Sequence, residues 1–241
     1  MTLFLTSSPC IYEHSPATLT GDNGFLTRLR AALPEKPRTL FVASSPEDHD
    51  RTEYFAQDMC GAFRRAGIHF KTSRILDSLS QDQAKEWVQE SDFIILMGGH
   101  VPTQNAFFRR VGLRELLKDF GGVIMGISAG TMNAAETVYA QPEDDGEAAP
   151  SFRRFYPGLG LTELMVCPHY QQVKNWLLDG KRLYGEITEA DSKHGFPFYI
   201  FPDGTYIYRD ANEYAIYGKC WRMKDGITEL LSPDGGRFDL K

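Results

Sequence analysis

The segment from Val123 to Ala135 constrains the fold more than any other part of the chain. It reads Val-Ile-Met-Gly-Ile-Ser-Ala-Gly-Thr-Met-Asn-Ala-Ala, an apolar run that passes through a Gly-x-Ser-x-Gly pentapeptide into small, helix-compatible residues. A strand that turns this sharply into a helix needs glycines around the turn, and it exposes the serine hydroxyl at the start of the helix. The pattern predicts an α/β fold with Ser128 as a nucleophile.

Short apolar runs alternate with helical patterns through the first two-thirds of the chain. Apolar residues at helical spacing between Phe55 and Ala66 predict a helix that Gly67 ends. Two further helices are expected, one over Phe107–Phe120 and one around Ala84–Val88 with Ser80 as its N-cap. The expected strands are Thr2–Leu5, Thr39–Ala43, Ile68–Lys71, Phe93–Met97 and Val123–Ile127. This alternation predicts a doubly wound, mostly parallel sheet with helices on both faces.

The pattern changes towards the C-terminus. Aromatic, β-rich runs at Thr205–Tyr208, Glu213–Tyr217 and Cys220–Met223 predict antiparallel strands added at the edge of the sheet. Residues 1–241 are therefore expected to form a single α/β domain with a β-rich extension over 204–241. A proline-rich, acidic segment from Gln141 to Pro157 is expected to be a long surface loop.

The composition argues against two classes of binding partner, nucleic acids and anionic membranes. The 241 residues carry a formal charge of -6, and clustered Lys and Arg would be needed to bind nucleic acid or an anionic membrane, so neither partner is expected. No membrane span or signal peptide is expected, and the dispersed cysteines form no CxxC pair. We expect a cytoplasmic protein that acts on a small substrate, and the sequence leaves open whether it forms a homodimer.

A second glycine turn, Gly98-Gly99-His100, ends the strand that precedes the nucleophile strand. The turn matches neither of the glycine-rich phosphate-binding patterns, GxGxxG and GxxxxGK(S/T). It should lie at the same edge of the sheet as Ser128. The backbone N–H groups of Gly99 and Ala129 are the expected donors of an oxyanion hole. His100, Thr131 and Tyr170 are the expected substrate contacts.

A serine nucleophile needs a base, and His169 is the best candidate among the six histidines. The run Leu164–Pro168 reads as a buried strand, so the imidazole should emerge where that strand ends. The acid that orients the ring is less well determined. Asp203 follows an apolar strand and precedes Gly204, while the alternatives are Glu136, Glu143, Asp144, Asp145 and Glu147. The chain order Ser, His, Asp differs from that of α/β-hydrolases.

The Gly-Gly turn, the Gly-Ile-Ser-Ala-Gly pentapeptide and the later Pro-His-Tyr stretch resemble the peptidase E and cyanophycinase family over roughly 92–204. These serine peptidases have a fold similar to that of class I glutamine amidotransferases and cleave aspartate-containing peptides. The resemblance implies Ser128 as nucleophile, His169 as base and an oxyanion hole from Gly99 and Ala129. Asp203 stands where relatives carry a glutamate, and peptidase E has also been described with an aspartate soon after the nucleophile.

The chain departs from the family at its first turn, where relatives often have Gly-Gly-Gly-Asn-Thr and this chain has Gly98-Gly99-His100. The resemblance implies hydrolysis of aspartyl dipeptides through an acyl-enzyme, with no metal or organic cofactor. A cation should then pair with the substrate carboxylate, and the candidates are Arg109, Arg110, Arg153 and Arg154. The alternatives are a hydrolase acting on another amide or ester, a non-catalytic binding protein, and a glutaminase, which would normally carry cysteine in place of Ser128.

Overall fold

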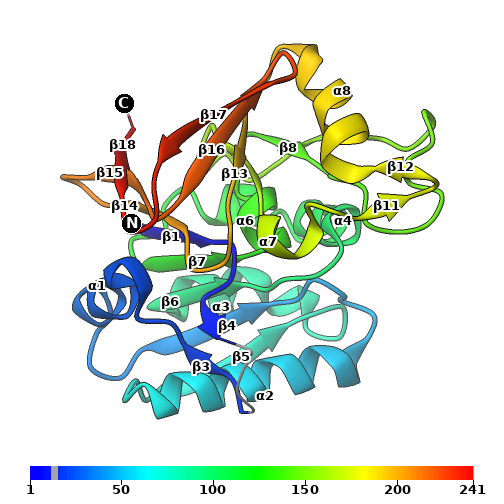
Figure 1. The fold of residues 1–241 in the computed structure, drawn as a ribbon. Helices are drawn as coiled ribbons and strands as arrows, with labels where there is room; N and C mark the ends of the chain where they lie inside the picture. Colours follow the sequence, from blue (N-terminus) through cyan, green and yellow to red (C-terminus); the bar gives the residue numbers. More distant parts are fainter. Residues whose placement is uncertain (12–15, 241) are drawn as a thin grey trace.

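The computed structural model describes residues 1–11 and 16–240 and is built around one large sheet. Figure 1 shows this sheet in the middle of the molecule, with a smaller sheet above it. Five adjacent strands are parallel, and three antiparallel strands extend the sheet on one side. In spatial order the strands are β18 (Arg237–Asp239), β15 (Tyr214–Tyr217), β14 (Tyr206–Arg209), β1 (Thr2–Thr6), β7 (Val123–Ile127), β6 (Phe93–Leu96), β4 (Arg38–Val42) and β5 (Thr72–Leu76).

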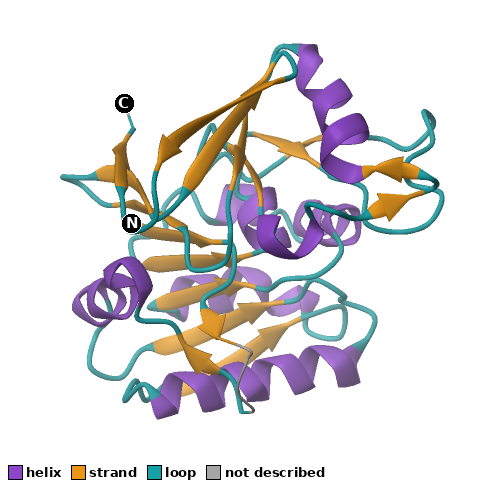
Figure 2. Ribbon diagram, viewed as in Figure 1, coloured by secondary structure: helices purple, strands orange, loops and turns teal. Residues whose placement is uncertain are grey.

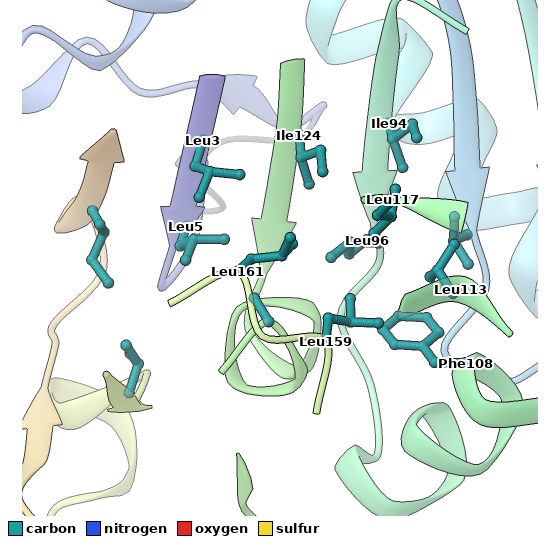
Figure 3. Packing of buried hydrophobic residues seen from close by; sticks show 14 of the residues in the cluster. Leu3, Leu5, Ile94, Leu96, Phe108, Leu113, Leu117, Ile124, Leu159 and Leu161 are labelled. Carbon is teal, nitrogen blue, oxygen red and sulfur yellow. The ribbon is translucent and has the colours of Figure 1, made fainter. Parts of the chain in front are cut away.

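Helices cover both faces of the large sheet, as Figure 2 shows. On one face, Phe25 and Phe63 pack against strand residues such as Phe4 and Met125. On the other, leucines of β1 and β6 pack with residues of the facing helices and loops, including Leu113, as seen in Figure 3. The covering helices are α1 (Phe25–Ala32), α2 (His49–Arg65), α3 (Ala84–Glu90), α4 (Val101–Arg110), α5 (Leu113–Leu116) and α6 (Ala129–Asn133). Burial on both faces explains why the central strands are almost wholly apolar, and the predicted fold class is confirmed.

A second sheet carries the later part of the chain. It pairs β10 (Met165–Cys167) in parallel with β13 (Phe198–Ile200), followed by antiparallel β16 (Cys220–Lys224) and β17 (Ile227–Ser232). The prediction that Cys220–Met223 extends the large sheet was therefore wrong, although β14 and β15 do so. The short β-rich pattern of this segment fits either sheet edge, and the pairing with β13 decides between them.

The remaining elements are short. Three hairpins pair β2 (Cys10–Ile11) with β3 (Thr18–Leu19), β8 (Thr137–Tyr139) with β9 (Phe155–Pro157), and β11 (Leu177–Leu178) with β12 (Lys181–Arg182). The short helices are α7 (Tyr170–Val173), α8 (Glu189–Asp191), a π-helical turn over Leu183–Thr188 and 3₁₀ turns at Asp22–Gly24, Gln81–Gln83 and Ser192–His194. Within residues 1–11 and 16–240, no helix combines the length and apolar character needed to cross a membrane.

Two other sequence predictions need correction. The strand expected at Ile68–Lys71 lies at β5 instead, because Ile68 packs into the core beneath α2 once Gly67 has ended that helix. The helix expected over Phe107–Phe120 is divided into α4 and α5 by Gly112, whose φ is +65°. Ser80 precedes the 3₁₀ turn before α3, but its hydroxyl donates to the Ile75 carbonyl and caps no helix.

Candidate active site

Ser128 lies at the sharp turn between β7 and α6, as the sequence predicts. Its backbone has φ 51° and ψ −112°, a conformation that costs a non-glycine residue free energy. The turn is held by its neighbours, because the Ser128 N–H donates to the carbonyls of Thr6 (3.1 Å) and Ser7 (3.2 Å) at the end of β1. Strain that is held in place in this way is typical of functional residues.

The glycines on either side of Ser128 are required by close packing. A Cβ on Gly126 would lie 2.9 Å from the backbone nitrogen of Thr131 in α6. A Cβ on Gly130 would lie 2.2 Å from the carbonyl oxygen of Leu96 in β6. Neither backbone position can accommodate a side chain, so both glycines let the new helix pack directly on the strand ends.

His169 and Asp203 come from the second sheet. They follow β10 and β13, which pair in parallel with Cys167 opposite Ile200, so the two loops leave the same edge. His169 Nδ1 lies 2.7 Å from Asp203 Oδ1, and the two side chains are 27% and 19% exposed. His169 also has a positive φ of 67°. The structure thus joins the predicted base to the predicted acid.

Two glutamines hold Asp203, one through its carboxylate and one through its backbone. Gln172 Nε2 donates to Oδ2 at 2.7 Å, and Gln171 Oε1 accepts from the Asp203 N–H at 3.0 Å. Burial raises the pKa of Asp203, but hydrogen bonds from His169 and Ser7 and the charge of His169 outweigh it, so the pKa is lowered overall. Asp203 is therefore a carboxylate at neutral pH and acts only as an acceptor.

The lowered pKa predicts a pH dependence of stability. Ionised Asp203 stabilises the fold above its ordinary pKa of 3.8, and this contribution is lost as the pH falls through the lower folded pKa. The free energy of unfolding of wild type should exceed that of Asp203→Asn by about 1 kcal/mol at pH 6, and the difference should shrink towards pH 3. Urea unfolding of both proteins measures this difference in the free energy of unfolding. The contributions of the other carboxylates are the same in both proteins and cancel. A gap that widens in acid would contradict the assignment.

Two of the other acids considered for this role have partners elsewhere. Glu136 forms an ion pair with Arg114 at 2.7 Å. Glu147 Oε1 lies 2.9 Å from His100 Nε2, and its other oxygen accepts from the N–H groups of Glu143 and Asp144. Among the acids weighed from the sequence, Asp203 is the one whose carboxylate bonds to the His169 ring in the described part of the chain.

The Gly-Gly turn lies beside Ser128. A Cβ on Gly98 would lie 3.3 Å from the Ser128 Cβ, and the Gly98 carbonyl accepts from Ser44 Oγ at 2.6 Å. Ala129 is fully buried as the first residue of α6. Of the two expected oxyanion donors, Ala129 is therefore adjacent to Ser128 in the chain, and Gly99 follows the glycine that approaches Ser128 in space.

Gly99 should not tolerate a larger residue. A Cβ there would lie 2.4 Å from Ser44 Oγ and 2.8 Å from Ser44 Cβ. Gly99→Ala should therefore push Ser44 away from Gly98, lowering the free energy of unfolding by about 1–3 kcal/mol. Gly121→Ala is the matched control, since nothing lies within 4 Å of its added Cβ. Urea unfolding distinguishes the two, and equal stability would show that the turn has more room than the structure indicates.

His100 anchors the acidic loop over the turn. Its Nδ1 lies 2.7 Å from Thr103 Oγ1, while its Nε2 faces Glu147. The loop is held further by Asp179, which accepts from the N–H groups of Gly146 and Ala148. Ligand atoms of His100, Asp144 and Glu147 lie within 4.8 Å of one another and could approach a metal ion. The His100–Glu147 contact accounts for the cluster without one.

The other two residues predicted to contact substrate, Thr131 and Tyr170, bond to or pack against other parts of the protein. Thr131 is fully buried, and its hydroxyl donates to the Thr6 carbonyl at 2.7 Å, so it fastens α6 to β1. Tyr170 is half-buried at the start of α7, with its ring 4.8 Å from that of Trp221 and 5.1 Å from that of Tyr184.

The candidate arginines are mostly engaged. Arg110 pairs with Glu47 and Arg154 with Asp191. Arg153 lies over the Tyr156 ring at 4.6 Å and donates to the Phe155 carbonyl. Arg109 is exposed on α4 and lines a cleft of about 290 Å³ with Phe108 and Leu159. None of these contacts involves Ser128, His169 or Asp203.

Sequence reasoning missed the residues that support the acid. Ser7 Oγ donates to Asp203 Oδ1 at 2.7 Å, and Gln171 and Gln172 hold the rest of Asp203. The only available signal for the glutamines was their position directly after His169-Tyr170. Nothing in the sequence connects Ser7 with Asp203, because their proximity depends on the pairing of β1 with β14.

Comparison with known proteins identifies the family to which the chain belongs. The model of peptidase family S51 matches residues 4–216. A crystal structure of a candidate peptidase E from Listeria monocytogenes EGD-e aligns with a TM-score of 0.58 and 19% identity, covering 96% of this chain and 98% of that one. No curated protein sequence matches significantly. Since this match spans most of the chain, the chain belongs to peptidase family S51, a family of serine peptidases.

Proposed function

We propose that this protein hydrolyses short aspartyl peptides, Asp-X or β-Asp-X, with Ser128, His169 and Asp203 as its catalytic triad. One observation carries the proposal. A hydrogen-bonded His169–Asp203 pair, 2.7 Å between Nδ1 and Oδ1, lies with a strained serine at the strand ends. The backbone N–H groups of Ser128 and His169 both bond to Ser7, which supports the proposal that the two residues act together.

The tautomer of His169 follows from its partner. Because the Asp203 carboxylate can only accept, Nδ1 carries the ring proton and Nε2 is left as the base. The structure records no hydrogen bond from the Ser128 hydroxyl to this ring within residues 1–11 and 16–240. In many free enzymes this contact tightens only when substrate binds.

The reaction is acyl transfer. Nε2 of His169 takes the Ser128 proton as Oγ attacks the peptide carbonyl, and the N–H groups of Gly99 and Ala129 donate to the oxyanion. Nε2 then gives its proton to the leaving amine. Water, deprotonated by the same nitrogen, cleaves the resulting ester and restores Ser128.

His100 is the group that we propose to recognise the aspartyl carboxylate. It directly follows the oxyanion donor Gly99, and its Nε2 already binds a carboxylate, that of Glu147. A substrate carboxylate would take the place of Glu147 on this nitrogen. The sequence resemblance to the peptidase E and cyanophycinase family supports aspartyl substrates, and the His100–Glu147 contact supports the site of recognition.

A panel of Asp-X, β-Asp-X, Glu-X, Asn-X and neutral dipeptides tests the proposal. Wild type should cleave the aspartyl members, Ser128→Ala should cleave none, and His100→Ala should lose its preference for Asp-X over Asn-X. If wild type cleaved neutral peptides alone, the proposed triad would stand but the proposed aspartyl specificity would be refuted. Inactivity across the panel would favour another amide or ester substrate, or a protein that binds without turnover.

A further inference from the structure

Ser7 directly follows β1, and all of its polar groups are engaged at the site. It is fully buried. Its N–H donates to the Thr205 carbonyl at 3.1 Å, and its carbonyl accepts from the Ser128 N–H at 3.2 Å. Its hydroxyl contacts both Asp203 Oδ1 at 2.7 Å and the His169 N–H at 3.2 Å. One residue of the large sheet therefore bonds to the nucleophile, the base and the acid.

The direction of these hydrogen bonds is determined by the chemistry of the partners. The carboxylate of Asp203 can only accept, so the hydroxyl hydrogen of Ser7 points to Oδ1. The lone pairs of Ser7 Oγ then accept the backbone N–H of His169, while the ring Nδ1 is 3.5 Å away and donates to Asp203 instead. Oδ1 thus receives two hydrogen bonds, one from the base and one from Ser7.

This arrangement connects the two sheets. His169 and Asp203 leave strands of the second sheet, whereas Ser128 leaves the large sheet. The Ser7 hydroxyl also binds the backbone of His169, whose φ of 67° needs external support. A buried hydroxyl shared by the acid and the base loop can hold their side chains at a fixed position relative to the nucleophile.

We propose that Ser7 is a positioning residue of the active site, whose hydroxyl fixes the Asp203 carboxylate and the His169 loop relative to Ser128. The proposal rests on the proposed triad. Ser7 does not touch the reacting atoms, so it should act only through Asp203 and His169.

The neighbouring Ser8 provides a matched control. It is also buried, at 3% exposure, but within the described residues its hydroxyl bonds locally, to the backbone of Cys10. Ser7→Ala and Ser8→Ala each remove one buried hydroxyl from adjacent positions. A purely structural role would give both variants a similar loss of stability and no specific loss of catalysis.

Ser7→Ala should lower kcat about 10-fold with little change in KM, and Ser8→Ala should leave both near wild type. In an Asp203→Ala background, Ser7→Ala should cause a clearly smaller further loss, because one of the two groups through which Ser7 acts is gone and only its bond to the His169 backbone remains. Urea unfolding confirms that each variant is folded under assay conditions. Wild-type kcat in folded Ser7→Ala, or an equal loss in both backgrounds, would overturn the proposal.

A measurement without substrate separates this proposal from the proposed function. The ¹H resonance of His169 Nδ1–H reports the hydrogen bond to Asp203, and it should shift or broaden in Ser7→Ala but not in Ser8→Ala. If wild type cleaves no peptide and this change is still seen, the peptidase proposal fails while the positioning role stands. If wild type is active and the resonance is unaffected by Ser7→Ala, the positioning role is refuted.

Discussion

Ser128→Ala should reduce peptide hydrolysis by a factor on the order of 10⁴ or more, because no acyl-enzyme can form without the hydroxyl. The protein should remain folded, since the Ser128 N–H still bonds to Thr6 and Ser7. Initial rates at saturating substrate measure the loss. Residual activity within 10-fold of wild type would show that another group is the nucleophile.

Ser128→Gly gives a second readout of the same site. At φ 51° a glycine avoids the Cβ strain that serine and alanine share. The glycine variant should therefore be inactive like Ser128→Ala, yet more stable than the alanine variant by about 1 kcal/mol in urea unfolding. A less stable glycine variant would mean that the turn is not strained in solution.

Asp203→Asn should have the second largest effect, a loss in kcat on the order of 10⁴ if this acid behaves as in other Ser-His-Asp sites. An asparagine amide can donate to Nδ1 of His169 and so favour the tautomer whose Nε2 carries a proton and cannot act as a base. KM should change little, because Asp203 bonds to His169, Ser7 and Gln172 and is not proposed to contact substrate.

Gln172→Ala is the comparison for Asp203→Asn. It removes a hydrogen bond to Oδ2 of Asp203 but leaves the one that His169 Nδ1 donates to Oδ1. The loss in kcat should therefore be far smaller. If Asp203→Asn retained near-wild-type kcat, one of the other acids considered, such as Glu147 or Glu136, would have to orient the base.

Several parts of the fold follow directly from local sequence. The central strands are buried on both faces, so the apolar runs at Phe93–Met97 and Val123–Ile127 predict β6 and β7 closely. The edge strand β5 is paired on one side only and has a mixed pattern, and the apolar Ile68 just before it misdirected the prediction. Pro102, near the first position of α4, was the overlooked signal for the start of that helix.

The active site was predictable to a similar extent. Ser128 and His169 each follow a strand and stand in short motifs, so one sequence suffices to propose them as candidates. Asp203 could be favoured but not chosen, because its pairing with His169 depends on the register between β10 and β13. Ser7 could not be found at all, since it joins the site through long-range strand pairing that no local pattern encodes.

The central claim is that Ser128 is a serine activated by His169, and covalent labelling tests it most directly. Purified wild type, Ser128→Ala and His169→Ala would each be incubated with a fluorophosphonate probe and followed by intact mass and peptide mapping. We predict a single adduct on Ser128 in wild type, none at that position in Ser128→Ala, and labelling slowed by at least about 100-fold in His169→Ala. Folded wild type that stays unlabelled, or labelling that is equally fast without His169, would contradict the account.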